Sequence, residues 1–220
     1  MYGECRNYNV LNGHKNAVLE IHWSTNNRIV SASADKTVAL WDPNRGRRLS
    51  RLTEHDGIVN TCAVARDAPD LFASGSDDCS VLLWDMRAKR SQLLMSHPYQ
   101  VTSLCMAHDG MSVYSGSIDN VIRKFDLRKE GAEVLALQGH TDTVTGLAMH
   151  PEGTHVLSNS MDQTLRSWDI RPFVPSEQHR CEKVLQGARV SGLCSNALQF
   201  AVCCRSYRSC ARVVLVFLFC

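Results

Sequence analysis

The sequence predicts an all-β fold in which similar four-stranded units pack side by side as blades of an incomplete β-propeller. The first observation is a segment that occurs four times, as SASADKTVALWDP, SGSDDCSVLLWDM, SGSIDNVIRKFDL and SNSMDQTLRSWDI. The aspartate at the fifth position of each copy recurs after 43, 41 and 43 residues, and a period of about 40–45 residues is typical of propeller repeats. The second observation is that short apolar runs, broken by Gly, Pro, Asp and Asn, recur throughout, which indicates strands rather than helices.

Each unit is expected to contain four strands, which we place in chain order. The first strands are predicted over 17–23, 58–64, 101–106 and 143–149. The second strands are predicted over 28–33, 71–76, 112–117 and 154–160. The turn with the repeated aspartate and then the third strand follow in each unit. In the last unit the third strand is predicted over 164–170 and the fourth strand over 182–187. The units then span about 13–52, 53–95, 96–137 and 138–187, after the last strand of an earlier blade at 6–12.

A histidine precedes each repeated aspartate by 21 to 23 residues and marks the loop before the first strand. With this histidine, the aspartate turn and the aromatic-Asp ending, the chain resembles the WD40 repeat family over about residues 2–187. The resemblance implies a β-propeller of which about four blades of a usual seven are present. It also implies that each blade holds a buried hydrogen-bonded chain of histidine, aspartate, serine and tryptophan. The implied sets are His14, Ser33, Asp35 and Trp41; His55, Ser76, Asp78 and Trp84; and His140, Ser160, Asp162 and Trp168.

Two points about these networks stay open at the level of sequence. The serine of each set could instead be the earlier member of its Ser-x-Ser pair, because spacing alone does not choose between them. The third unit, with His97, Ser117 and Asp119, has Phe125 where the others have tryptophan. Since phenylalanine has no N–H, this network should be shorter, and Ser117 should need another partner.

The His, Ser and Asp residues superficially resemble a catalytic triad, but we interpret them as structural. They occur four times, whereas an active site is normally built once. The G-x-S-x-G elbow, the P-loop, the dinucleotide-binding glycine motif and the H-E-x-x-H motif are all missing from the sequence. No His/Cys set has zinc spacing. We therefore expect no enzymatic activity, no cofactor, no metal and no small-molecule substrate.

Several stretches go beyond the generic repeat. YGECRNY (2–8), SIDNVIRKFDLR (117–128) and WDIRPFVPSE (168–177) resemble the WD-repeat members of the U5 small nuclear ribonucleoprotein. That resemblance implies a nuclear scaffold in pre-mRNA splicing that binds other proteins, above all the large central U5 protein. A net charge of +2 gives no indication of direct nucleic-acid binding, and the longest apolar run, 213–220, is too short to span a membrane.

An alternative function rests on the arginine that follows three of the aromatic-Asp endings. These candidate partner-binding residues are Arg87, Arg128 and Arg171. Substrate receptors of cullin-4 ubiquitin ligases share a W-D-x-R ending, and an arginine at a blade end can pair with an acidic partner. The competing interpretation is an exposed arginine that packs on its own loop.

The resemblance ends near Gly187, and residues 188–220 form a Cys-rich, apolar tail without an acidic residue. It is either a divergent extension or a product of out-of-frame or intron-derived coding sequence, and we favour the second. The chain would then be a truncated version of the family's array, and a non-functional truncated gene product is a further alternative. Unpaired blade edges recruit other chains, so we expect the isolated chain to be poorly soluble or oligomeric.

Overall fold

The computed structural model describes residues 9–172 and 180–186, and these residues form four antiparallel sheets of four strands each. Blade 1 contains β1 (Val18–Trp23), β2 (Ile29–Ser33), β3 (Val38–Asp42) and β4 (Arg47–Leu52). Blade 2 contains β5 (Val59–Val64), β6 (Leu71–Ser76), β7 (Ser80–Asp85) and β8 (Ser91–Ser96). Blade 3 contains β9 (Val101–Met106), β10 (Ser112–Ser117), β11 (Ile122–Asp126) and β12 (Ala132–Leu137), with the 3-10 turn η1 (Leu127–Lys129) between its last two strands. Blade 4 contains β13 (Val144–Met149), β14 (His155–Ser160), β15 (Thr164–Asp169) and β16 (Cys181–Gln186).

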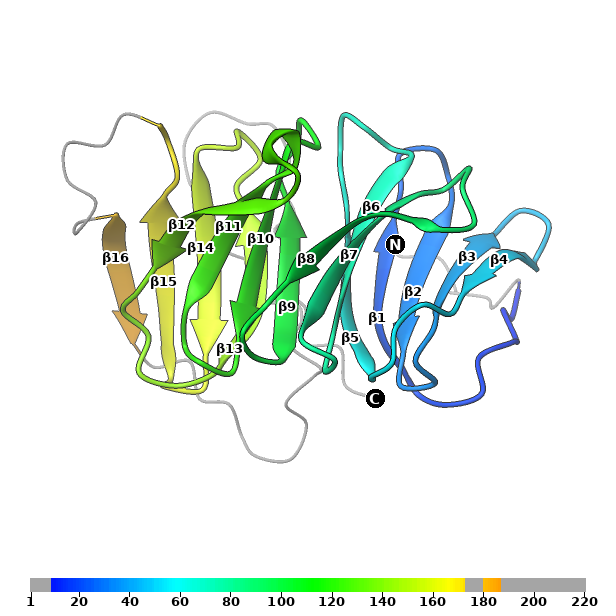
Figure 1. Cartoon of the computed structure of the whole chain (residues 1–220), viewed down its shortest axis with the longest axis horizontal. Coiled ribbons are helices and arrows are strands. Elements are labelled where there is room, and N and C mark those ends of the chain that lie inside the picture. The colour runs from blue at the N-terminus through cyan, green and yellow to red at the C-terminus, as the bar shows by residue number, and fades with distance from the viewer. Residues whose placement is uncertain (1–8, 173–179, 187–220) are drawn as a thin grey trace, which may run out of the picture.

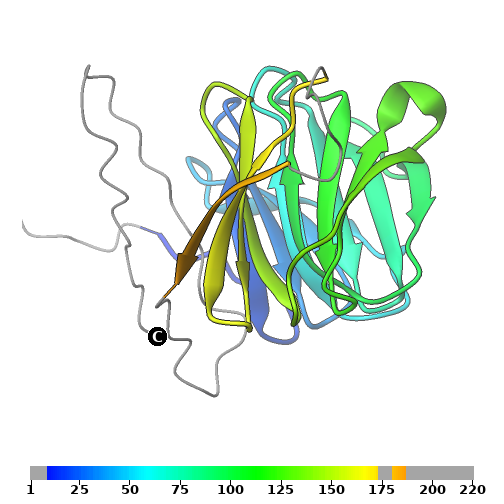
Figure 2. The ribbon, with the colours of Figure 1, turned by 90° about the vertical axis from the view of Figure 1, so that its left-hand side faces the viewer.

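The blades stand in a row in chain order, with blade 1 at one end and blade 4 at the other (Figure 1). The first strands of successive blades lie against each other: β1 against β5, β5 against β9, and β9 against β13. Figure 2 views the row from the end at which blade 4 is nearest. The all-β class and the incomplete WD40-type propeller predicted from the sequence are confirmed, and so are the four strands of each unit.

The core consists of apolar layers between neighbouring blades. Because side chains alternate along a strand, each blade sends one apolar set toward the blade before it and another toward the blade after it. Leu40 of blade 1 packs in a layer with Phe72 and Trp84 of blade 2. Leu83 of blade 2 lies in the next layer with Phe125 of blade 3. The third layer joins Tyr114 and Ile122 of blade 3 to Trp168 of blade 4.

The turn between the second and third strands is the same in all four blades. The residue after each repeated aspartate has a left-handed backbone, with φ of 65° at Lys36, 63° at Cys79, 69° at Asn120 and 64° at Gln163. Each aspartate stabilises this turn by accepting the amide proton two residues on, for example that of Thr37 at 3.1 Å.

Two sequence expectations concern the ends of the described region. Of the strand expected at 6–12, residues 9–12 are described and form no strand, so that part of the prediction is wrong. The expectations for the tail at 188–220 lie outside the described residues. No helix among the described residues is long and apolar enough to cross a membrane.

Candidate functional site: polar blade networks and blade-end arginines

Three of the four blades contain the same hydrogen-bonded chain. In blade 1, His14 lies with Nδ1 3.1 Å from Asp35 Oδ2 and Nε2 2.7 Å from Ser31 Oγ, and Trp41 Nε1 donates to Ser31 Oγ at 2.8 Å. In blade 2 the corresponding distances, for His55, Asp78, Ser74 and Trp84, are 2.8, 2.7 and 2.7 Å. In blade 4 they are 2.8, 2.6 and 2.7 Å, for His140, Asp162, Ser158 and Trp168.

The donors and acceptors of this chain are partly fixed by the chemistry of its groups. An ionised carboxylate can only accept, so Nδ1 of the histidine donates to the aspartate, and the indole N–H can only donate, so the serine oxygen accepts it. When the imidazole is neutral, its Nε2 accepts the serine proton. The chain connects a buried third strand to the loop before the first strand. Burial lowers the pKa of His55 and of His140, although the hydrogen bonds that they donate to their aspartates oppose this change.

The serine in these chains is the earlier one of each Ser-x-Ser pair. Assigning Ser33, Ser76 and Ser160 to the chains is therefore wrong, and the alternative left open by the sequence holds. The later serine instead fixes the turn: Ser33 Oγ accepts the amide proton of Asp35 at 3.1 Å and donates to the carbonyl of Ala17 at 2.9 Å. Ser76 and Ser160 accept the corresponding amide protons of Asp78 and Asp162 at 3.2 Å.

In blades 1, 2 and 4 the repeated aspartate accepts hydrogen bonds from other donors in addition to its histidine. Burial would raise the pKa of Asp35, but hydrogen bonds from the Thr37 hydroxyl, the Lys15 amide and His14 outweigh it and lower that pKa well below its usual value. The hydroxyl two residues after the aspartate recurs as Ser80 and Thr164, at 2.5 and 2.7 Å from the carboxylate. The sequence analysis missed this hydroxyl, although its position two residues after three of the four aspartates was visible.

Blade 3 lacks the chain. His97 turns its Nδ1 to the carbonyl of Tyr99 at 2.9 Å instead of to Asp119. Arg123 takes the aspartate, with Nη2 2.6 Å from Asp119 Oδ2. Ser117 donates to the same carboxylate, which supplies the other partner that the sequence analysis expected it to need. The buried Ser115 Oγ, which corresponds to Ser31, has no hydrogen-bond partner among the described residues.

These buried serines are poorly suited to attack a substrate. Ser74, Ser115 and Ser158 are 0% exposed, whereas a nucleophile has to be reached by its substrate. In three blades the serine oxygen already accepts an indole proton. The arrangement holds loops and strands together, and it offers no accessible reactive atom.

Each of the three blade-end arginines lies close to a carboxylate of its own blade. Arg87 Nη2 bonds Asp70, and Arg128 Nε lies 3.8 Å from Asp126. Arg171 makes the fullest pairing, with its Nε 3.0 Å from both carboxylate oxygens of Asp169 and its Nη2 2.5 Å from one of them. These hydrogen bonds lower the pKa of Asp169 to about 2. The arginine side chains nevertheless remain 76%, 67% and 58% exposed, so their outer faces can still meet a partner.

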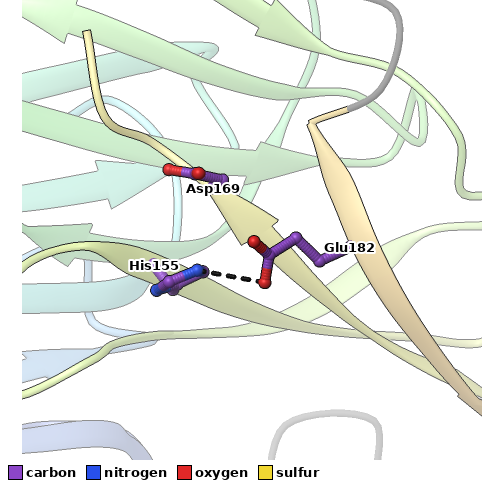
Figure 3. A group of neighbouring side chains, drawn as sticks. All are labelled: His155, Asp169 and Glu182. Carbon is purple, nitrogen blue, oxygen red and sulfur yellow. Dashed lines mark ion pairs between the residues drawn. The ribbon is translucent and has the colours of Figure 1, made fainter. Parts of the chain in front are cut away.

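One group of side chains in blade 4 could be considered for metal binding. His155, Asp169 and Glu182, from β14, β15 and β16, bring possible ligand atoms within 4.8 Å of one another (Figure 3). His155 Nε2 already faces Glu182 at 3.1 Å, and the arginine bound to Asp169 places a positive charge beside the group. The sequence did not show this cluster because its members come from three strands. The pairings make it a polar contact of the outer strands rather than an open ligand set.

The fold and its internal networks define a repeat protein of the propeller class. A family model described as "WD domain, G-beta repeat" matches residues 5–42, 46–85, 89–126 and 131–169. The chain belongs to the WD40 family.

Two of the similar curated proteins have names connected with splicing. The chain is 49% identical over 131 residues to the "U5 small nuclear ribonucleoprotein 40 kDa protein" of Dictyostelium discoideum, which covers 59% of this chain and 37% of that protein. It is 35% identical over 129 residues to "Pre-mRNA-splicing factor cwf17" of Schizosaccharomyces pombe, covering 58% of this chain and 38% of that protein. A G-protein β subunit of Saccharomyces cerevisiae is 29% identical over 127 residues, covering 55% of this chain and 30% of that protein. The chain therefore spans well under half the length of these relatives.

Proposed function

We propose that this chain acts as a non-catalytic protein-interaction scaffold in pre-mRNA splicing, as a nuclear component of the U5 small nuclear ribonucleoprotein. The observation that carries the proposal is the 49% identity to a protein named for that particle, against 29% to a G-protein β subunit. The second splicing-factor name supports the same assignment.

The geometry is compatible with a scaffold. The polar groups that resemble a catalytic site are used inside the blades, where they hold the loops. What remains for partners is the outer surface, including exposed apolar side chains such as Ile58, Tyr99 and Ile118. From the resemblance noted in the sequence, the partner we expect is the large central U5 protein, with no direct nucleic-acid contact.

A second candidate function, substrate receptor of a cullin-4 ligase, is favoured by the exposure of the blade-end arginines. It is weakened by the carboxylates that already pair with them, because a partner would have to compete with Asp70 or Asp169. Both functions can be tested with the same purification.

The experiment is affinity purification of the tagged full chain from nuclear extract, followed by mass spectrometry. Enrichment of U5 proteins is expected, and it should persist in an Arg171→Ala chain. Enrichment of a cullin-4 adaptor that is lost in Arg171→Ala and Arg87→Ala would favour the second candidate. Enrichment of neither set would contradict both functions and favour a chain without a function of its own.

A further inference from the structure

The first blade exposes an apolar set that the other blades bury. Val18 lies opposite Ser33, as Val59, Val101 and Val144 lie opposite the second serines of their blades. Those three valines are 0% exposed and pack against the preceding blade, whereas Val18 is 48% exposed. Trp23 corresponds in the same way to Met106, which is 4% exposed, yet Trp23 is 56% exposed. We call the side of blade 1 with Val18 and Trp23 the leading face.

The last blade exposes a residue on its opposite side. Leu185 pairs with Leu165 in the same register in which Leu52, Met95 and Leu137 pair with the first apolar residue of their third strands. Those three side chains are 1–3% exposed and lie in the layer shared with the following blade. Leu185 is 51% exposed. We call the side of blade 4 that carries Leu185 the trailing face.

A buried polar atom on the trailing face can be compared with its equivalents in the preceding blades. Between blades 1 and 2, Glu20 Oε2 accepts the amide proton of Cys62 at 2.7 Å, and between blades 2 and 3, Thr61 Oγ1 accepts that of Leu104 at 3.0 Å. In blade 4 the position of Thr61 is Gly146, and Asn159 lies opposite it. Asn159 Oδ1 is buried and has no hydrogen-bond partner in the described part of the chain. It is an acceptor at the place where blades 1 and 2 receive an amide proton from the next blade. In blade 3 this place is occupied by Ser103, whose buried Oγ has no partner among the described residues.

We propose that the trailing face of blade 4 binds the leading face of blade 1 of a second copy of this chain, head to tail. Within one chain this type of contact, trailing face to leading face, is already made three times, so a second copy offers the surface that the fold is built to accept. The described blades of two copies joined at both ends number eight, which lies within the range of about 4–8 blades in closed propellers. The contact is heterologous, and it closes only if the rotation between copies completes the ring.

The proposal goes beyond the proposed splicing function and does not depend on it. The test is the mass of the purified full chain in solution, measured by size-exclusion chromatography with multi-angle light scattering. The unaltered chain is expected at twice its single-chain mass. Trp23→Asp and Leu185→Asp should each reduce it to the single-chain mass, because each change places a charge in both interfaces of the ring.

Leu94→Asp is the matched control, since Leu94 is 63% exposed but lies in blade 2, whose two faces are covered by neighbouring blades. It should keep the two-copy mass. All the changed residues are exposed, so folding is checked by circular dichroism and a thermal melt. A single-chain mass for the unaltered protein, a two-copy mass retained in both face variants, or an open series of larger species would overturn the proposal.

Discussion

Serine-to-alanine changes at equivalent positions of blades 2 and 3 can measure what the buried network contributes. Ser74 and Ser115 occupy the same place in their second strands, and both are 0% exposed. Ser74 Oγ holds Trp84 Nε1 and His55 Nε2, each at 2.7 Å. Ser115 Oγ holds nothing among the described residues. The two substitutions therefore remove the same atom from equally buried sites and differ in the hydrogen bonds that are lost.

The expected difference is large compared with the error of a stability measurement. Ser74→Ala leaves a buried indole N–H and a buried imidazole nitrogen without partners, and each such group costs about 1–3 kcal/mol. Allowing for partial rearrangement, we expect a loss of about 2–4 kcal/mol in the free energy of unfolding. Ser115→Ala removes a hydroxyl that is already unpaired, so the change should lie between about zero and a gain of 1 kcal/mol.

The assay is thermal and urea unfolding, followed by circular dichroism and tryptophan fluorescence. For a chain of this size about 1 kcal/mol shifts the melting temperature by about 2–4 °C, so the two variants, which differ by about 2–5 kcal/mol, should differ by about 4–20 °C. Ser76→Ala serves as a comparison, because among the described residues its oxygen accepts only the amide proton of the turn, at 3.2 Å, and the change should cost about 1 kcal/mol. Equal losses for Ser74→Ala and Ser115→Ala would refute the assignment of the stabilisation to the hydrogen bonds.

Three further predictions follow from the same geometry. Burial lowers the pKa of His55, His97 and His140 below 6.5. The unfolded chain therefore binds more protons than the folded chain, and stability should fall as the pH drops from about 6.5 toward the folded-state pKa values. A melting temperature that stays constant from about pH 7.5 to 5.5 would contradict this prediction. The aspartates, whose folded pKa values lie below 3.8, should add a second loss beneath about pH 4. Val121→Thr would give blade 3 the turn hydroxyl present at Thr37, and should raise stability by about 0.5–1.5 kcal/mol in urea unfolding; an unchanged midpoint would count against it. Gly57→Ala would place a Cβ 2.6 Å from the backbone nitrogen of Asp78 and should cost about 1–3 kcal/mol, whereas a variant as stable as the parent would show that the loop yields.

Much of the fold could be predicted because the sequence pattern of each strand and turn recurs four times. The strand runs and the aspartate turns follow from spacing, and the pairing of histidine with aspartate was implied by the resemblance to WD40 repeats. The choice of serine could not, because residues two apart in a strand point to the same side. Ser31 and Ser33 therefore lie on the same side of their strand, and the turn distinguishes them: Ser33 accepts the amide proton of Asp35, whereas Ser31 lies against His14.

The rearrangement of blade 3 could be predicted only in part. The loss of the indole N–H at Phe125 was visible in the sequence, and so was the need of Ser117 for another partner. That Arg123 would bond Asp119 was not visible, because a long flexible side chain can reach several groups or water. The turn of His97 toward Tyr99 depends on a local loop conformation in the same way.

Blade 3 also bears on what specifies the fold. It has lost the tryptophan, the turn hydroxyl and the histidine–aspartate bond, yet its strands pair in the same order and with an equivalent register. Its apolar side chains fill the layers on both sides, with Phe125 toward blade 2 and Tyr114 toward blade 4. A blade between two neighbours therefore forms without the histidine–serine–tryptophan chain, and that chain adds stability to a structure that packing and the aspartate turn already define. If so, removing the network from blade 2 should lower the melting temperature while leaving the far-ultraviolet spectrum of the folded chain unchanged.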